Sequence, residues 1–341
     1  MTSSSAVRYT PERVLTHLPE SLRAALQFII TFVSIHYLQW MWVAIGVLCY
    51  LYYIGYGYVV VALVAIYTPM FMNGAHRKVT PEKGGKQWKS LRNHGIWNLM
   101  CEYLGMEIVR EQELDPKKQY VFAYHPHGIL VLSRLSYYAG NFDALFPGIE
   151  ARVLGATPMF YVPLGREICL WLDAVDASRS TAQKVLDNNL SIIVYPGGSK
   201  EIFQTNPNSK ETVLVLNKRL GFIKLAVKNG AELVPIFVFG EKWMYNMWNP
   251  PKSVTEAVLQ CFKVPMLLFW GRFCTWMPYQ LTGKRKLGVV YGKPIPVDKK
   301  EDPTDEECME LHAKYVESLK TIFHTYKTEF GYDHDETLVI A

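Results

Sequence analysis

The chain has 341 residues, of which 50% are hydrophobic and 13% aromatic, and its formal net charge is +5. This length suits one large domain or two smaller ones. The basic residues form no Lys/Arg tract and do not alternate with aromatic residues, so a nucleic acid is not an expected partner. The six cysteines are scattered without a CxxC pair, which argues against a disulfide framework or a zinc finger and fits a reducing compartment.

The N-terminal part of the chain predicts a membrane hairpin. Residues 1–19 are a polar tail without the short apolar core of a secretory signal. From Ala24 to Met72 there is no Lys, Arg, Asp or Glu, and one straight helix of that length would measure ~70 Å, more than twice a hydrocarbon core of about 30 Å. We therefore expect two helices within residues 20–72. Two buried helices of a soluble core are the alternative, which the uncharged length disfavours.

The turn and the orientation of this hairpin follow from two further patterns. The stretch 34–42, "SIHYLQWMW", is more polar and aromatic than its flanks, and Tyr and Trp favour the membrane–water interface. We therefore expect the turn there, between helices over 20–38 and 42–70. Basic residues flank both outer ends of the hairpin, so the positive-inside rule predicts that both termini of a multi-pass protein face the cytosol.

The remainder of the chain predicts an α/β domain. After a charged connector over 73–115, which includes an amphipathic helix through "WNLMCEYLGMEI", short apolar runs alternate with helix-period segments. Such runs are typical of a mostly parallel sheet with covering helices on both faces, and we place this domain at 116–330, before a C-terminal tail over 331–341. The expected strands are "YVFAY" (120–124), "RVLGA" (152–156), "SIIVYP" (191–196), "ELVPIFVFG" (232–240) and "KLGVVYG" (286–292).

Two segments of this domain carry a specific structural prediction. Thr304 and Glu307 form a capping box at the start of a last helix that should run to about Phe330. Residues 259–282 hold two Trp, three Phe and two Met but are interrupted by prolines and a glycine. This segment is too broken for a transmembrane helix, and we expect it to rest on the bilayer, with a second core layer as the alternative.

The run "VFAYHPHG" ends an expected strand on His125 and His127, with Gly128 next. The pair is open to three interpretations: a metal site, a general base with a helper, or a plain turn. A catalytic zinc ion usually has three protein ligands, and the other histidines are scattered, so no metal is expected. The base interpretation is favoured, because a partner follows another strand.

That partner lies in the segment "YPGGSKEIF" at 195–203. The carboxyl ends of parallel strands share one sheet edge, so Glu201 is expected to hydrogen-bond a histidine and fix its tautomer. Gly197 and Gly198 would offer backbone N–H groups to a developing oxyanion. There is no G-x-S-x-G elbow, so the base would activate a substrate hydroxyl directly.

These motifs resemble a known family. The stretches "ELDPKKQYVFAYHPHGIL", "VPLGREICLWLDAVDASRSTAQKVL", "IIVYPGGSKEIF" and "NKRLGFIKLAVKNGAELVPIFVFGE" are similar to the signature of the type-2 diacylglycerol acyltransferases, which include monoacylglycerol and wax acyltransferases, and the resemblance spans about 90 to 330. It implies a fold like that of the glycerolipid acyltransferases. Those enzymes carry an Asp five residues after the histidine, where this chain has Leu130 and Leu132, so the carboxylate must come from elsewhere. Two further departures are Tyr103-Leu104-Gly105 and Leu220, where many members have Tyr-Phe-Pro and a lysine.

The resemblance implies acyl transfer from acyl-CoA, a substrate and not a cofactor, to the free hydroxyl of diacylglycerol. We expect His127 to be the base, since it is presented at the start of the next helix, with His125 as its neighbour, although the reverse assignment stays open. The phosphates of CoA need cations, and the candidates are Arg166, Arg179, Lys200, Arg219 and Lys224.

Several alternatives and properties stay open at this point. Monoacylglycerol, a fatty alcohol or a sterol are alternative acceptors, and a lipid-droplet hairpin protein that binds lipid without chemistry is the non-enzymatic alternative. The resemblance implies an endoplasmic-reticulum membrane location, with the lipid-droplet surface as a second site. Whether the chain forms a homo-oligomer is not determined by its sequence.

Overall fold

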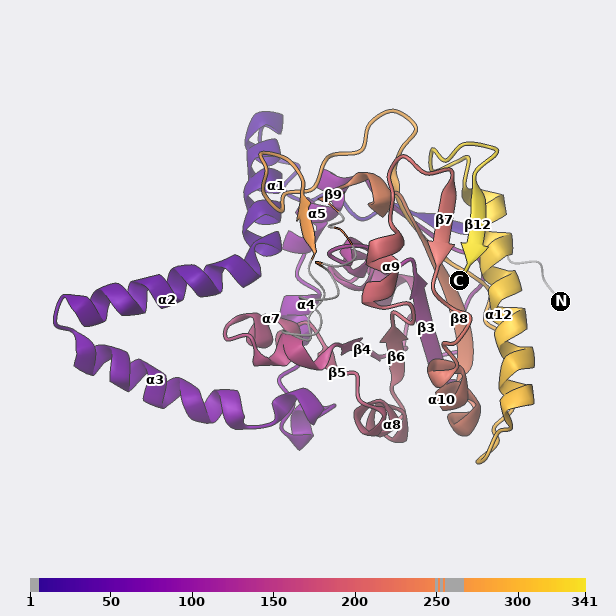
Figure 1. Ribbon diagram of the computed structural model, residues 1–341, viewed down its shortest axis with the longest axis horizontal. Helices are drawn as coiled ribbons and strands as arrows, with labels where there is room; N and C mark the ends of the chain where they lie inside the picture. The colour runs from indigo at the N-terminus through magenta and orange to yellow at the C-terminus, as the bar shows by residue number, and fades with distance from the viewer. Residues whose placement is uncertain (1–5, 249–250, 252–253, 255–266) are drawn as a thin grey trace.

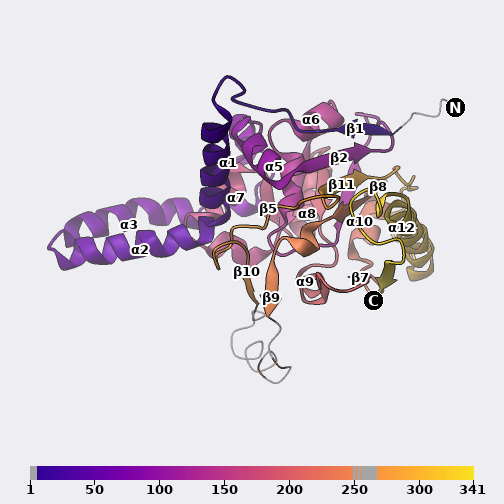
Figure 2. The same ribbon diagram turned by 90° about the horizontal axis from the view of Figure 1, so that it is seen from above.

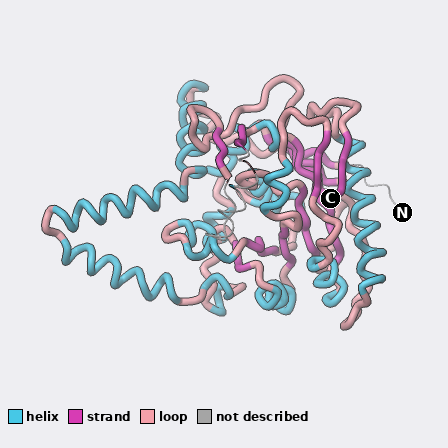
Figure 3. The backbone as a smooth tube through the Cα atoms, viewed as in Figure 1, coloured by secondary structure: helices cyan, strands magenta, loops and turns pink. Residues whose placement is uncertain are grey.

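The computed structural model describes residues 6–248, 251, 254 and 267–341. Its centre is an eight-stranded sheet in the order β1-β2-β11-β8-β3-β6-β4-β5. The pairs β1–β2 and β11–β8 are antiparallel, and all other neighbours in this sheet are parallel. The predicted α/β fold with a largely parallel sheet is therefore confirmed, and Figures 1 and 3 show the strands gathered between helices.

The strands of the large sheet follow the short apolar runs of the sequence. Every residue of β3 and β8 is buried, as expected for central strands covered on both faces. The strands are β1 (Val7–Tyr9), β2 (Met106–Arg110), β3 (Tyr120–His125), β4 (Ala151–Gly155), β5 (Ala174–Asp176), β6 (Ser191–Val194), β8 (Glu232–Phe239) and β11 (Leu287–Tyr291). Two small sheets pair β9 (Asn246–Trp248) with β10 (Leu268–Trp270), and β7 (Glu211–Leu214) with β12 (Thr337–Ile340).

Helices cover both faces of the large sheet, and each face has its own apolar core. One core is closed by α5 (Ile96–Leu104), α6 (Asn141–Leu145), α7 (Gly165–Trp171) and the 3₁₀ helix η3 (Leu132–Tyr137). The other core is closed by α8 (Arg179–Asp187), α10 (Gly221–Asn229) and α12 (Asp305–Tyr326). The predicted capping box at Thr304 and Glu307 starts α12, and α4 (Lys89–Arg92) and α9 (Ser199–Gln204) complete the α-helices of the domain.

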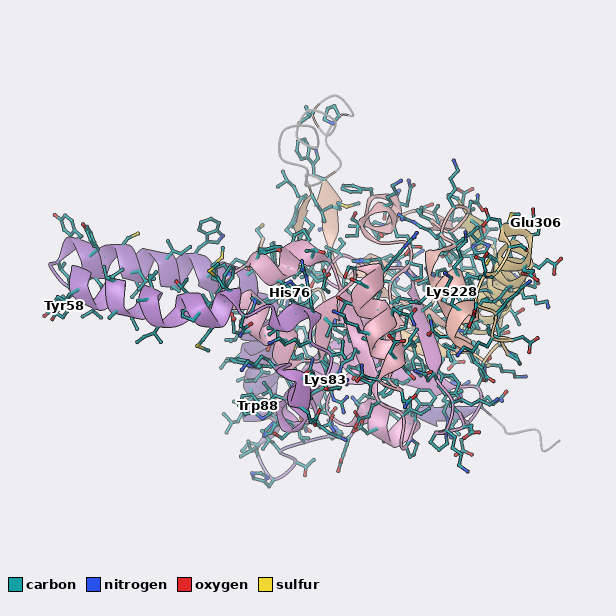
Figure 4. All side chains as sticks on the ribbon, turned by 90° about the horizontal axis from the view of Figure 1, so that it is seen from below. Tyr58, His76, Lys83, Trp88, Lys228 and Glu306 are labelled. Atoms are coloured by element: carbon teal, nitrogen blue, oxygen red, sulfur yellow. The ribbon has the colours of Figure 1, made fainter. Side chains whose placement is uncertain are left out.

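The apolar N-terminal stretch forms α1 (Glu20–Ile35), α2 (Tyr37–Tyr53) and α3 (Gly57–Met72). Figures 1 and 2 show α2 and α3 side by side as a hairpin that projects from the α/β body. Neither helix has a buried residue, and Figure 4 shows their side chains pointing outward, with Tyr58 near the tip. The helix over Gly57–Arg77 is long and apolar enough to cross a bilayer, and α1 with α2 qualifies as one span bent by 72°.

The hairpin reverses at a different place from the predicted one. The stretch 34–42 contains the bend between α1 and α2, whereas the chain reverses between Tyr53 and Gly57, where Gly55 has φ +94°. The histidine in the stretch where we expected the turn is bonded within α1 and to the α/β body instead. His36 Nδ1 lies 2.7 Å from the Phe32 carbonyl oxygen, and its Nε2 accepts from the Trp276 backbone N–H at 3.2 Å.

Other segments also differ from the expectations. The predicted helix through "WNLMCEYLGMEI" ends at Leu104, where Gly105 adopts φ +62°, and its last residues belong to β2. Part of the N-terminal tail pairs with β2 as β1, and the predicted C-terminal tail contains β12, which pairs with β7. Most of the segment 259–282 that we expect on the bilayer lies within the described residues from 267 on, and 259–266 lie outside them. Three of its described residues, Leu268, Trp270 and Phe273, have exposed side chains.

Candidate active site

The two motifs that the sequence singled out meet at one edge of the sheet. The strands β3 and β6 are parallel neighbours, so their carboxyl ends lie together. His125 is the last residue of β3, and Glu201 lies on α9, the first helix after β6. The structure therefore brings together Glu201 and the histidine pair, as the strand pattern predicted.

The Glu201 carboxylate is buried, with 1% of the residue exposed, and it has three hydrogen-bond partners. Its Oε1 lies 3.1 Å from His125 Nδ1 and accepts from the Val215 backbone N–H at 3.0 Å. Its Oε2 accepts from the backbone N–H of His127 at 2.8 Å. Glu201 thus contacts the imidazole of His125 but reaches His127 only through the backbone.

Two positions in this region must be glycine, because a side chain there would collide with a buried carboxylate. A Cβ atom on Gly197 would lie 1.8 Å from the carboxyl carbon of Glu201. Gly128 has φ +67°, and a Cβ atom there would lie 1.5 Å from Oε2 of Glu241. Any side chain at either position would therefore displace a buried carboxylate.

The two histidines have different surroundings. His127 lines a cavity, and its Nδ1 lies 2.8 Å from the carbonyl oxygen of Gly128. Because a carbonyl oxygen only accepts, Nδ1 carries the proton and Nε2 keeps a free lone pair in the neutral ring. Burial lowers the pKa of His127, so this ring is neutral at physiological pH. These are the properties of a general base.

His125 is placed differently. It has no exposed surface and does not line the cavity. Its Nε2 is buried and has no hydrogen-bond partner among the described residues. The structure thus divides the features expected of the base between the two histidines: His127 lines the cavity, whereas Glu201 contacts the imidazole of His125.

The sequence analysis missed a second buried acid next to this loop. Glu241 follows β8, and its Oε1 accepts from the backbone N–H of Ser133 at 2.6 Å. Burial raises the pKa of Glu241 to about 7. Its signal in the sequence was its place just beyond the end of an apolar run, and the loops that hold the histidine pair and Glu201 also lie at strand ends.

The cavity has a volume of about 920 Å³ and crosses the carboxyl edge of the sheet. On the side of α8 and α10 it is lined by cations, and on the side of α2 and α7 it is lined mainly by apolar residues, while His127 lies on its wall. The cationic residues on α8 and α10 are Arg179, Lys224 and Lys228, and the apolar lining includes Leu38, Ile129, Met159 and Phe160. Figure 4 shows Lys228 on the α/β body, away from the hairpin tip at Tyr58.

The predicted cations divide into two groups. Arg179 and Lys224 line the cavity, together with Lys228, which the sequence analysis did not name. Lys200 and Arg219 do not line it. Lys200 is exposed on α9, and Arg219 donates to the carbonyl oxygen of Gly197 at 3.4 Å, so it supports the glycine loop.

Arg166 lies away from the cavity, and its position does not support the predicted contact with CoA. Its guanidinium is buried and donates to the carbonyl oxygen of Met70 at 3.2 Å and to Asn73 Oδ1 at 2.8 Å. It also pairs with Glu167 at 2.8 Å. Arg166 therefore joins α7 to the end of α3, which fixes the base of the hairpin to the body.

The glycine loop differs from the expectation in one detail. The Gly198 backbone N–H donates to the Tyr195 carbonyl oxygen at 3.1 Å within a turn. This bond occupies a group that we predicted for the oxyanion. Gly198 lines the cavity nonetheless, and no group of three or more His, Cys, Asp or Glu side chains in the described part of the chain is arranged to hold a metal ion.

Comparisons with known proteins identify what the chain is similar to. A family model described as "Diacylglycerol acyltransferase" matches residues 50–341. The chain is 32% identical to a 2-acylglycerol O-acyltransferase 1 of Mus musculus, over 93% of this chain and 94% of the relative. It is 33% identical to a diacylglycerol O-acyltransferase 1 of Schizosaccharomyces pombe, over 78% and 77% of the two chains. It is 31% identical to a diacylglycerol O-acyltransferase 2 of Danio rerio, over 76% and 75%. No solved structure matches the chain.

Proposed function

Because the chain belongs to the diacylglycerol acyltransferase family, we propose that it transfers the acyl group of acyl-CoA to the free hydroxyl of diacylglycerol and so makes triacylglycerol. Acyl transfer to a glycerolipid is the activity of the family. The observation that carries the proposal for this chain is the placement of His127 in a cavity with cations at one side and apolar residues at the other. Acyl-CoA has the same two chemical ends, phosphates and a hydrocarbon chain.

The proposed mechanism uses His127 as the general base. Its Nε2 takes the proton of the acceptor hydroxyl, and the oxygen attacks the thioester carbonyl carbon. The C–S bond then breaks, CoA leaves, and the imidazolium returns the proton to the departing sulfur. Glu201 holds the backbone N–H of His127, and the Gly128 carbonyl holds the ring with Nε2 unprotonated. The proposed steps need no cofactor.

We propose that the reaction takes place at the membrane, with both substrates reaching the cavity from that side. Tyr37 and Leu38 of α2 line the cavity, so the hairpin contributes directly to its wall. The exposed side chains of Leu268, Trp270 and Phe273 support a second contact with the bilayer. A multi-pass arrangement in the endoplasmic reticulum with both termini cytosolic and a lipid-droplet location stay predictions of the sequence.

An acceptor panel tests this function. Microsomes that contain the protein are incubated with radiolabelled oleoyl-CoA and 1,2-dioleoylglycerol, 2-oleoylglycerol, hexadecanol or cholesterol. We expect labelled triacylglycerol from dioleoylglycerol. The extensive match to a protein named 2-acylglycerol O-acyltransferase favours 2-oleoylglycerol as a second acceptor. Failure to form an ester with any acceptor would favour lipid binding without chemistry.

The cations on α8 and α10 should control the affinity for acyl-CoA. Replacing Lys228 or Arg179 with methionine removes one charge that would pair with a phosphate, and we expect the KM for oleoyl-CoA to rise about 3–10-fold with kcat unchanged. The rate as a function of oleoyl-CoA concentration measures both constants. Lys184→Met is the matched control, because Lys184 is exposed on α8 but does not line the cavity. An equal effect in the control would contradict the assignment.

The activity should fall in acid as His127 becomes protonated. A base acts only when it is unprotonated, and burial lowers the pKa of His127 below its ordinary value of 6.5. We therefore expect kcat/KM to be constant near pH 7 and above and to fall only below pH 6.5. Glu241, with a pKa of about 7, is a second buried group near the site that titrates in this range. The profile should keep its acid limb in Glu241→Gln, and an acid limb that disappears in this variant would assign the titration to Glu241 instead.

A further inference from the structure

Arg134 is a cation on the cavity wall for which the mechanism above has no role. It lies on η3, the 3₁₀ helix that follows the histidine loop, and it lines the same cavity as His127. It forms no ion pair with a described residue, and the hydroxyl of Tyr138, an uncharged group, is its hydrogen-bond partner. A guanidinium with five donors is rarely left in this state, because removing a charge from water costs free energy unless a partner replaces the water.

No group around Arg134 is held against it as an ionised partner. The side chains that act on it most strongly are hydroxyls and a thiol, from Tyr37, Tyr138, Tyr195 and Cys169. Burial raises the pKa of Tyr138 to about 12 and also raises the pKa of Tyr195 and of Cys169, so these groups are neutral at physiological pH. The carboxylate of Glu241 accepts from the Ser133 backbone N–H and forms no ion pair with Arg134. The cavity wall therefore carries a positive charge that no ion pair with a described residue neutralises.

This charge lies beside the reacting histidine. The ring of Tyr195 contacts the ring of His127, with 5.5 Å between the ring centroids, and Tyr195 is also a neighbour of Arg134. The hydroxyl of Tyr195 is buried and has no hydrogen-bond partner among the described residues. A guanidinium without an ionised partner and a hydroxyl without an acceptor thus lie on the same stretch of wall, next to the base.

An oxygen atom of a bound substrate is a partner that suits both groups. The phosphates of CoA have a separate set of cations on α8 and α10. Arg134 is surrounded instead by Tyr37 of α2 and Cys169 of α7, which belong to the other side of the cavity. The oxygen that develops negative charge close to His127 during acyl transfer is the carbonyl oxygen of the thioester.

We propose that Arg134 is a catalytic residue that donates hydrogen bonds to the thioester carbonyl oxygen and stabilises the negative charge that forms on it when the acceptor oxygen adds. This role takes over the oxyanion contact that the Gly198 N–H, bonded to Tyr195, does not provide. The inference rests on the proposed acyl transfer. By analogy with other oxyanion donors, loss of Arg134 should reduce kcat by about 10²–10³-fold.

Two non-reactive analogues test the contact without a reaction. S-(2-oxoheptadecyl)-CoA keeps a carbonyl group one carbon from the sulfur, and S-heptadecyl-CoA lacks it. The Kd of each analogue is measured for the full-length protein in detergent micelles. We expect the ketone to bind more tightly to the unmodified protein, and Arg134→Met to weaken ketone binding about 10–100-fold while the binding of S-heptadecyl-CoA stays unchanged. Unchanged binding of the second analogue also shows that the variant is folded.

Other outcomes would overturn the proposal. Equal weakening of both analogues would place Arg134 on the phosphates, which is the behaviour we expect of Lys228→Met. Unchanged binding of both analogues together with an unchanged kcat would remove Arg134 from the acyl-CoA site. Neither outcome affects the proposed function, which fails only if the unmodified protein acylates no acceptor in the panel above.

Discussion

Replacing His127 with asparagine is expected to reduce the rate of acyl transfer by roughly 10²–10⁴-fold, the usual contribution of a general base. Asparagine is the informative substitution, because its Nδ2 can still donate to the carbonyl oxygen of Gly128 in place of His127 Nδ1. The variant therefore keeps the hydrogen bond of the loop and removes Nε2, the nitrogen proposed to take the proton. Acyl transfer in microsomes, normalised to the amount of protein in the membrane, measures the effect.

The matched control for this prediction is His125→Asn. The new Nδ2 can replace His125 Nδ1 as the donor to Glu201, and the ring that it removes does not line the cavity. We expect this variant to lose thermal stability but to keep much more activity than the His127 variant. Full activity of His127→Asn, or a greater loss in the control, would reverse the assignment of the base.

Substitution of Glu201 is expected to affect stability and activity together. Its carboxylate accepts three hydrogen bonds in a buried site, two on Oε1 and one on Oε2. Alanine would leave all three donors without an acceptor, at a cost of about 3–5 kcal/mol. That cost corresponds to a fall in melting temperature on the order of 10 °C for a domain of this size, and the loss of the His127 backbone contact should abolish measurable transfer.

Glutamine at position 201 separates the contacts further. Its carbonyl oxygen can accept from His125 and Val215 as Oε1 does, but its amide group would then face the backbone N–H of His127, donor against donor. We expect a smaller loss of stability than in the alanine variant and a large loss of activity. Glu306→Gln is the control, because Glu306 is exposed on α12 (Figure 4). A glutamine variant with normal activity would show that the His127 backbone contact is dispensable.

The sequence predicted well which motifs meet at the carboxyl ends of the strands. Short apolar runs that alternate with helices predict a parallel sheet, and the rule that carboxyl ends share an edge then places Glu201 beside the histidine pair without any structure. The same rule would have drawn attention to Glu241, which lies just beyond the end of β8. Arg134 and Lys228 carried no such signal. They lie within or between helical segments, and only the three-dimensional structure shows that their side chains reach the cavity.

The hairpin and the chain ends show why other expectations from the sequence differ from the structure. Aromatic and polar residues around His36 favour an interface, but in the structure that histidine bonds to Phe32 and to Trp276, which is 240 residues away. The C-terminal strand β12 also has a distant partner, because its Thr337 pairs with Glu211 of β7, 126 residues earlier in the chain. Composition and periodicity show only which structure a segment prefers locally. A residue far away in the chain can change that outcome when it bonds to the polar groups of the segment.

If His127 takes the proton from the acceptor hydroxyl, its loss should matter much less for an acceptor that loses its proton easily. A thiol has a pKa near about 8.5, far below that of an alcohol, and depends much less on a base. Transfer by the His127→Asn variant is therefore measured with 1,2-dioleoylglycerol and with its 3-thiol analogue, each relative to the unmodified protein. We expect the rate of transfer to fall roughly 10²–10⁴-fold with the alcohol and less than about 10-fold with the thiol. Equal losses with both acceptors would contradict this role, because His127 would then be needed for something other than proton removal.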